Sequence, residues 1–95
     1  MLTSKQRAQL RAMANGLSAI FQIGKEGVTE NLIRGVDEAL EKRELVKISI
    51  LENSPSQAKE SMERIAKEVN AEPVQCIGRR FVLYRESEKY KRIEL

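Results

Sequence analysis

The chain has 95 residues, of which 41% are hydrophobic and 33% charged, and this predicts a single domain with one modest core, residues 1–95. No apolar run is long enough for a membrane helix and the N-terminus lacks the features of a secretory signal, so we expect a cytoplasmic protein. Histidine is absent and Cys76 is the only cysteine, which excludes zinc fingers, Cys–His nucleophiles and Ser-His-Asp triads. We therefore expect no enzyme, no metal site and no cofactor.

The net charge of +3 is unevenly distributed along the chain. Residues 1–36 and residues 74–95 each hold three more basic than acidic side chains, whereas residues 37–73 hold three more acidic than basic ones. If the two ends meet in space, they form a basic face backed by an acidic one, as expected for a protein that binds a polyanion. The alternative is an ordinary charged surface with local imbalance.

The first predicted helix begins with a capping box, in which Thr3 is the N-cap and Gln6 reaches back to it. Asn15-Gly16 predicts that the helix ends in a left-handed conformation. Arg7 and Arg11 are four residues apart and share one face of this helix. They are either solvated charges or part of a binding surface.

A glycine turn follows the first predicted strand. The apolar run at residues 19–23 predicts a strand buried on both faces, with Gln22 left open as an exception. Gly24-Lys25-Glu26-Gly27 stops the strand, and Thr29 caps a helix over residues 30–43. Glycine at both ends of the turn allows positive φ and close approach of another backbone, and the helix N-terminus favours a phosphate. KH modules clamp nucleic-acid backbones with such a G-x-x-G loop, although most such tetrapeptides are ordinary turns. Arg34, away from the apolar stripe of the helix, is expected to reach an anion held there.

The second half of the chain predicts a strand, a helix and a hairpin. In residues 45–51 apolar side chains alternate with polar ones, which predicts a strand with one face exposed to solvent. Ser54 and Pro55 predict the start of a helix that ends at Asn70. Residues 74–77 and 81–85 predict a hairpin around Gly78-Arg79. The charged tail, residues 86–95, is expected to be partly ordered at best.

The order of these elements defines the fold class. Three helices alternate with strands before a final hairpin, which predicts an α/β domain: a two-layer sandwich of the order α-β-α-β-α-β-β. Its four-stranded mixed sheet is expected to combine parallel pairs with an antiparallel edge.

Three stretches of the chain resemble the signature stretches of a known family: Leu2–Arg7, Gln22–Thr29 and Ile77–Arg85. They look like those of the CRM domain (chloroplast RNA splicing and ribosome maturation), and the length is that of its free-standing bacterial members, the YhbY-like proteins. The resemblance covers essentially the whole chain. It implies an RNA-binding domain with a fold similar to the C-terminal domain of translation initiation factor 3, associated with large-subunit ribosomal RNA or its precursor particle. We expect the protein to be a monomer or a weak dimer.

The resemblance also implies which residues bind RNA. Gly24 and Gly27 would shape a loop whose N–H groups meet the RNA backbone, and Lys25 would contact a phosphate as a mobile point charge. Glu26 would point outward or accept a hydrogen bond from a ribose hydroxyl. Six further residues would neutralise neighbouring phosphates: Arg7, Arg11, Arg34, Arg79, Arg80 and Arg85.

Two other functions compete with this interpretation. One is a protein–protein adaptor that docks on ribosomal proteins or assembly factors through the acidic middle of the chain. The other is a nucleotide-binding enzyme, which is disfavoured because the chain contains neither G-x-x-x-x-G-K-[ST] nor G-x-G-x-x-G.

Overall fold

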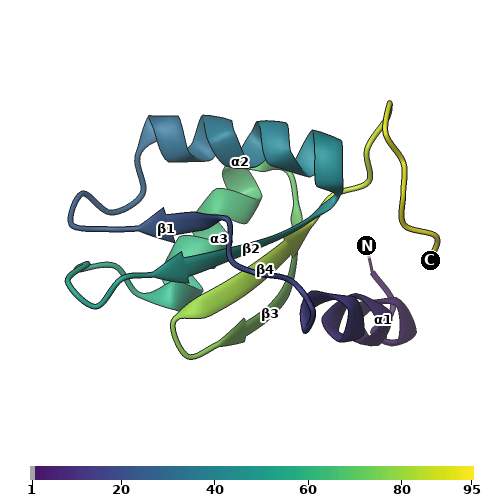
Figure 1. Ribbon diagram of the computed structural model, residues 1–95, viewed down its shortest axis with the longest axis horizontal. Coiled ribbons are helices and arrows are strands. Elements are labelled where there is room, and N and C mark those ends of the chain that lie inside the picture. The colour runs from purple at the N-terminus through teal and green to yellow at the C-terminus, as the bar shows by residue number, and fades with distance from the viewer. Residues whose placement is uncertain (1) are drawn as a thin grey trace.

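The computed structural model describes residues 2–95 and contains three helices and four strands. In chain order these are α1 (Ser4–Ala14), β1 (Phe21–Ile23), α2 (Glu30–Arg43), β2 (Leu45–Ile50), α3 (Ala58–Val69), β3 (Glu72–Ile77) and β4 (Arg80–Tyr84) (Figure 1). The predicted order of elements and the four-stranded mixed sheet are confirmed. None of the helices in this part of the chain has the length and apolarity needed to cross a membrane.

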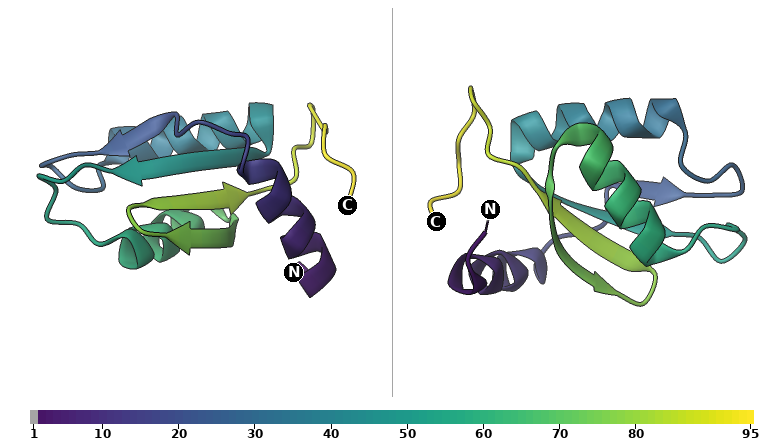
Figure 2. Two further views of the ribbon diagram at one scale, coloured as in Figure 1. Left: turned by 60° about the horizontal axis from the view of Figure 1, so that its bottom comes forward. Right: turned by 180° about the vertical axis from the view of Figure 1, so that it is seen from behind.

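The strand order in the sheet is β1-β2-β4-β3, so the last strand of the chain lies between two earlier ones. β1 pairs in parallel with β2, and β4 pairs antiparallel with both β2 and β3. The expectation of several parallel pairs was therefore wrong for the strands described, because β4 separates β2 from β3. A consequence is that β1, β2 and β3 all run in the same direction and end at the same end of the sheet (Figure 2).

The larger core lies between α2, α3 and one face of the sheet. The alternation of β2 sends Val46, Ile48 and Ile50 to this face, where Phe81 and Leu83 of β4 join them. Buried side chains of the two helices complete the cluster: Val36, Leu40, Met62, Ile65, Ala66 and Val69. Burial of these apolar groups is the main force that holds the two helices on the sheet.

A smaller core lies on the opposite face of the sheet, under α1. Leu10 and Ala14 are fully buried there, and the sheet contributes Leu45, Val82 and Tyr84. α1 contacts β2 and β3, and it covers only the half of this face at which β2 begins. The other half of the face has no helix over it (Figures 1 and 2).

Local signals in the sequence located some element ends correctly and others not. The Thr3–Gln6 capping box and the Thr29 cap are confirmed, since the side chain of Thr29 accepts a hydrogen bond from Leu32 N–H at 3.1 Å. Asn70 is left-handed with φ 57°, whereas Asn15, expected to be left-handed, is right-handed with φ −59°.

Two predicted elements start later than expected. α3 begins at Ala58, and its N-cap residue Gln57 makes no side-chain cap hydrogen bond. The hydroxyl of Ser54, the expected cap, instead accepts a hydrogen bond from Ser56 N–H at 3.1 Å, within the loop. β1 begins at Phe21 rather than residue 19, and Ile20, which was expected to be buried in the strand, is exposed before it. Within β1 the exposed residue is Gln22, the exception that the sequence left open.

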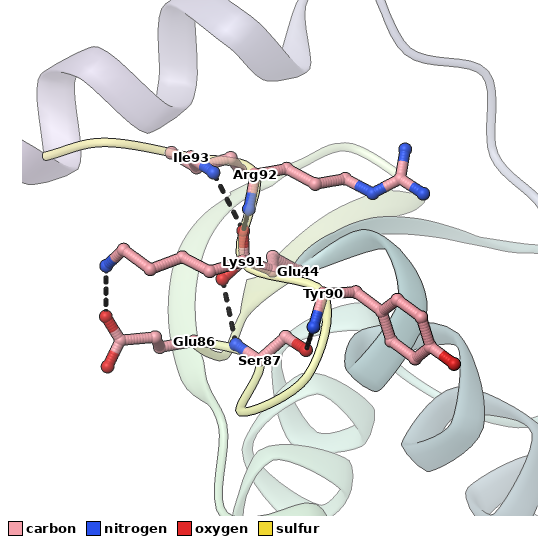
Figure 3. Close-up of polar contacts among 7 residues, drawn as sticks. All are labelled: Glu44, Glu86, Ser87, Tyr90, Lys91, Arg92 and Ile93. Carbon is pink, nitrogen blue, oxygen red and sulfur yellow. Dashed lines mark hydrogen bonds and ion pairs between the residues drawn. The ribbon is translucent and has the colours of Figure 1, made fainter.

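The C-terminal tail packs against the body of the protein, where a partly ordered segment was expected. Glu44, fully buried between α2 and β2, accepts backbone hydrogen bonds from Ser87 at 2.8 Å, Arg92 at 2.6 Å and Ile93 at 2.8 Å (Figure 3). The side chain of Ile93 is buried in the smaller core. We call this arrangement of one carboxylate and three N–H groups the tail clamp.

The tail clamp changes the acidity of Glu44. Burial alone would raise the pKa of Glu44, but the three backbone N–H groups stabilise the carboxylate more strongly and hold its pKa below the ordinary value. Glu44 also has a positive φ of 66°, which is a costly conformation for a side chain of this kind. The hydrogen bonds of the clamp offset that cost.

We predict that Glu44→Gln lowers the free energy of unfolding by about 1.5–3 kcal/mol, because the variant removes the negative charge to which three backbone N–H groups donate hydrogen bonds. The folded pKa of Glu44 lies below the unfolded one, so its stabilisation is complete above the unfolded pKa and is lost as pH falls through the folded pKa. Urea unfolding of both proteins between about pH 7 and pH 3 should therefore show a smaller acid loss in the variant.

Glu88→Gln is the matched control, since Glu88 is an exposed carboxylate in the same tail. Equal acid sensitivity of the wild type and Glu44→Gln would show that other carboxylates control the unfolding.

Candidate nucleic-acid interface

The direction of the strands brings three loops to one end of the sheet. β1 runs into the glycine turn at residues 24–27, β2 into residues 51–57, and β3 into the Gly78-Arg79 turn. Figure 1 shows these loops together at the left, with α1 and both termini at the opposite end. We call this the loop end of the molecule.

The two glycines of the turn have different structural roles. Gly27 has φ +71°, and a Cβ added there would lie 3.1 Å from the hydroxyl oxygen of Ser56. Gly27 N–H donates to the Gly24 carbonyl at 3.0 Å and so closes the turn. Gly24 has no positive φ, and a Cβ there would meet only a methyl carbon of Leu51 at an ordinary 3.8 Å. Positive φ is therefore adopted by Gly27 and not by Gly24, and the close approach of another backbone at Gly24 stays a prediction.

Two hollows lie side by side at the loop end. The first, of about 420 Å³, is lined by the glycine turn with Lys25, together with Thr29, Leu51 and Asn53. The second, of about 600 Å³, lies between the ends of β1 and β2 and the turn that carries Arg79 and Arg80. Both are lined by Gln22 and Leu51, so they form one continuous surface.

A row of four residues crosses the open half of the sheet beside this surface. In the strand register Gln22 lies opposite Ser49, Ser49 opposite Arg80, and Arg80 opposite Ile77. All four therefore point to the face that α1 leaves uncovered. Ile77 is 68% exposed, more than any other large hydrophobic residue that the structure describes. We call these four residues the cross-strand row.

The cross-strand row was missed in the sequence, except for Arg80. Lys47, which the alternation of residues 45–51 assigns to the solvent-facing side of the strand, is half-buried on the same side as Ser49 and precedes it by two residues. The signal that could have found the row is the alternation of β2 together with the strand order. The order was not available from the sequence, because β4 inserts between β2 and β3.

Only some of the residues predicted to contact RNA lie at the loop end. Lys25, Glu26, Arg79 and Arg80 are exposed there, and the guanidinium of Arg79 donates to the Leu51 carbonyl at 3.2 Å. That contact holds Arg79, which lines the second hollow, beside Leu51, which lines both.

Arg85 has a structural position instead. Its guanidinium donates to the Asp37 carboxylate at 2.6 Å, to the Asp37 carbonyl at 2.8 Å and to the Val69 carbonyl at 2.7 Å. It thereby ties the end of β4 to α2 and to the end of α3.

Three further arginines also lie away from the loop end. Arg7 is half-buried and donates to the carbonyl of Pro73, and Arg11 is exposed on the same helix α1. Arg34 lies 3.5 Å from the Asn31 side-chain oxygen and borders a hollow that Glu30, Asp37 and Glu68 also line. Arg34 is not among the residues that line the hollow at the glycine turn, and its reach toward an anion held there stays a prediction.

Within residues 2–95, no group of three or more His, Cys, Asp or Glu side chains could hold a metal ion. The loop end offers exposed cations, backbone N–H groups and open polar side chains. Such an arrangement can bind an anionic polymer.

Comparison with known proteins identifies the family. The model of the CRS1 / YhbY (CRM) domain matches residues 2–85. The chain belongs to the CRM domain family. This CRM domain is 46% identical to the Probable RNA-binding protein YqeI of Bacillus subtilis, over 100% of the chain and 99% of the relative. It is 32% identical to an RNA-binding protein of Haemophilus influenzae, over 95% of the chain and 91% of that protein.

A solved structure supports the fold of this CRM domain. The solution structure of the hypothetical protein SAV1595 from Staphylococcus aureus matches with a TM-score of 0.83 and 46% sequence identity, over 100% of the chain and 99% of that protein. The three helices and the four-stranded mixed sheet are thus the fold of this family.

We predict that alanine substitution separates the two glycines of the turn. Gly27→Ala should lower the free energy of unfolding by about 1–2 kcal/mol, because it combines a left-handed φ with a close contact to Ser56. Gly24→Ala should change it by no more than about 0.5 kcal/mol. Chemical unfolding of the two variants measures both; a larger loss for Gly24→Ala would contradict the assigned geometry.

Proposed function

We propose that this protein binds RNA at its loop end, with the glycine turn against the RNA backbone and Arg79 and Arg80 beside it. The observation that carries the proposal is Gly24, where the fold itself has no need of glycine. A missing side chain there leaves room for the close approach of another backbone, beside the exposed Lys25 and on the rim of an open hollow. Both relatives described above are named as RNA-binding or probable RNA-binding proteins, which supports the same function.

The electrostatics of the loop end support a phosphate ligand. Lys25 and Arg80 are exposed, and neither has an ion-pair partner in the described part of the chain. Both cations are therefore available to neutralise phosphates, and α2 directs the positive end of its helix dipole toward the same turn. Glu26, exposed in the turn, is left to accept a hydrogen bond from a ribose hydroxyl or to point into solvent.

Recognition should depend on RNA backbone and shape more than on base stacking. Phe81 and Tyr84 are buried, Phe21 is half-buried against the larger core, and Tyr90 lies in the tail. The cross-strand row contains no aromatic side chain, so it lacks the stacking platform of an RRM sheet. We propose accordingly that the protein prefers structured RNA.

The specific partner is proposed from the family resemblance. We infer that this chain contacts large-subunit ribosomal RNA, or its precursor particle, as a cytoplasmic monomer during assembly of the subunit. The adaptor alternative is weaker, because the acidic flank of α2 and α3 already contains Arg34 and Arg85, and Arg85 pairs with Asp37. Catalysis is not part of the proposal.

We predict that Lys25→Glu weakens RNA binding about tenfold, or roughly 1.4 kcal/mol, because a phosphate contact becomes a repulsion. Stability should change by only about 0.5 kcal/mol, since Lys25 is exposed in the turn. Filter binding or fluorescence anisotropy with a structured ribosomal RNA fragment measures the affinity. The matched control is Lys59→Glu, an exposed charge on α3 that should be nearly silent.

Two further measurements accompany this variant. Gly24→Ala should also weaken RNA binding while the fold stays intact, because its methyl group occupies the approach to the turn. The affinity of the wild type should fall with salt with a log–log slope of roughly −3 to −5, as for four to six phosphate contacts. Equal affinity of Lys25→Glu and Lys59→Glu, both folded, would show that the glycine turn is only a turn.

We predict that the protein sediments with the large ribosomal subunit or its precursor in a cell extract. Purification of the tagged protein should then recover large-subunit ribosomal RNA, and the Lys25→Glu variant should recover less. Recovery of only messenger or transfer RNA would overturn the ribosomal assignment and leave RNA binding in place.

A further inference from the structure

An apolar groove lies at the other end of the molecule, away from the glycine turn. It is a hollow of about 310 Å³ lined by Met13, Leu17, Leu45 and Ile93, with Arg43 and Arg92 as its two charged residues. A smaller hollow of about 170 Å³ shares Leu17, Arg43 and Leu45 and extends to Ile20 and Lys47. We call the six residues of the larger hollow the apolar groove.

The groove exposes apolar side chains to solvent. Met13 is 41% exposed and Leu17 40%, and Ile20, in the adjoining smaller hollow, is 42% exposed. These are three of the seven large hydrophobic residues exposed among residues 2–95. Exposed apolar side chains that gather in one place, rather than singly, are typical of an interaction site.

The tail clamp builds one wall of this groove. Glu44 lies between Arg43 and Leu45 in the sequence, and its carboxylate holds the N–H groups of Arg92 and Ile93. Glu44 binds the backbone N–H of Arg92 and leaves the guanidinium of Arg92 available for other contacts. In Figure 3 the side chains of Arg92 and Lys91 leave the tail in opposite directions. The buried carboxylate thus fixes a second arginine at the groove beside Arg43.

We propose that the apolar groove docks a segment of a partner protein in which an apolar side chain is flanked by carboxylates. Apolar contact with Met13 and Leu17 favours such a side chain, at about 25 cal/mol for each Å² removed from water. The charges of Arg43 and Arg92 favour the flanking carboxylates. An RNA strand satisfies the two arginines but gains little from an aliphatic floor, and no aromatic side chain lines the groove for a base to stack on.

A second copy of this chain is a poor occupant. Its acidic surface lies on α2 and α3, and none of the exposed large hydrophobic residues described belongs to either helix. These two helices therefore offer carboxylates without an apolar side chain to insert. Elsewhere on the described surface the exposed Leu51 and Leu95 each have one side-chain carboxylate beside them in the sequence. The net charge of +3 on each copy also opposes association.

The test is a titration of the full-length ¹⁵N-labelled protein with three synthetic peptides, followed by NMR. The first has leucines at helical spacing and glutamates elsewhere, the second replaces every glutamate by lysine, and the third replaces every leucine by serine. We expect the first peptide to shift the amide signals of Met13, Leu17, Leu45 and Ile93 and to leave Gly24 and Gly27 unmoved. Affinity for each control peptide should be about tenfold or more lower.

Variants assign the binding to the groove. Arg92→Glu and Leu17→Ser change exposed side chains and leave the backbone bonds of the tail clamp in place, and each should weaken the first peptide several-fold or more. Arg80→Glu is the matched control at the loop end, which should retain peptide binding and lose RNA affinity.

Four results would overturn the proposal. These are no shifts in the groove at millimolar peptide, equal binding of the glutamate and lysine peptides, displacement of the bound peptide from the groove by a ribosomal RNA fragment, and groove shifts that grow with protein concentration alone. The third result would mark the groove as a nucleic-acid surface, and the fourth would mark it as a self-association surface. Failure of RNA binding at the loop end leaves all four readouts unchanged.

Discussion

The position of β4 between β2 and β3 is the constraint on which the rest of this structure depends. It makes β1, β2 and β3 run in one direction, so the three loops that follow them meet at one end. It also gives β4 neighbours on both sides and cover on both faces, with Phe81 and Leu83 in the larger core and Val82 and Tyr84 in the smaller one. A central strand buried in this way fixes its register firmly, because a one-residue slip would exchange the two sets of side chains. The register in turn aligns the cross-strand row.

The charged groups at the two ends of the sheet differ in their exposure to solvent. At the tail end a carboxylate is buried and satisfied by three backbone N–H groups, which makes a rigid attachment for the last ten residues. At the loop end the cations remain exposed, and the glycine turn is closed by a single backbone hydrogen bond. A site for a large anionic ligand benefits from accessible charge, whereas a structural attachment benefits from desolvated, fully bonded charge. The exposed charge of the loop end therefore fits a binding role, and the buried, fully bonded carboxylate of the tail end fits a structural role.

The sequence predicted the elements better than their arrangement. The period of the apolar residues identified three helices and four strands, because burial on one face leaves a trace in each segment. Asn15 and Ser54 misled the prediction of helix ends, since short polar side chains cap helices and stabilise loops with the same hydrogen bonds. The tail clamp has no local signature: Glu44 is one of many glutamates, and the N–H groups that it binds are more than forty residues away. Of the candidate site, the sequence indicated the contiguous motifs, residues 24–27 and Arg79-Arg80, and did not indicate the cross-strand row, which depends on strand register.

Arginine shows most clearly why sequence alone could not separate binding from structure. A guanidinium offers several donors, so it serves equally well to neutralise a phosphate and to tie carbonyl groups together. Arg85 uses its donors on Asp37 and Val69, and Arg7 uses one on Pro73, whereas Arg80 projects from the open half of the sheet. The uneven charge along the chain is consequently not one basic face. Part of it stabilises the fold, part lies at the loop end, and part, at Arg43 and Arg92, borders an apolar groove where a carboxylate rather than a phosphate is the better ligand.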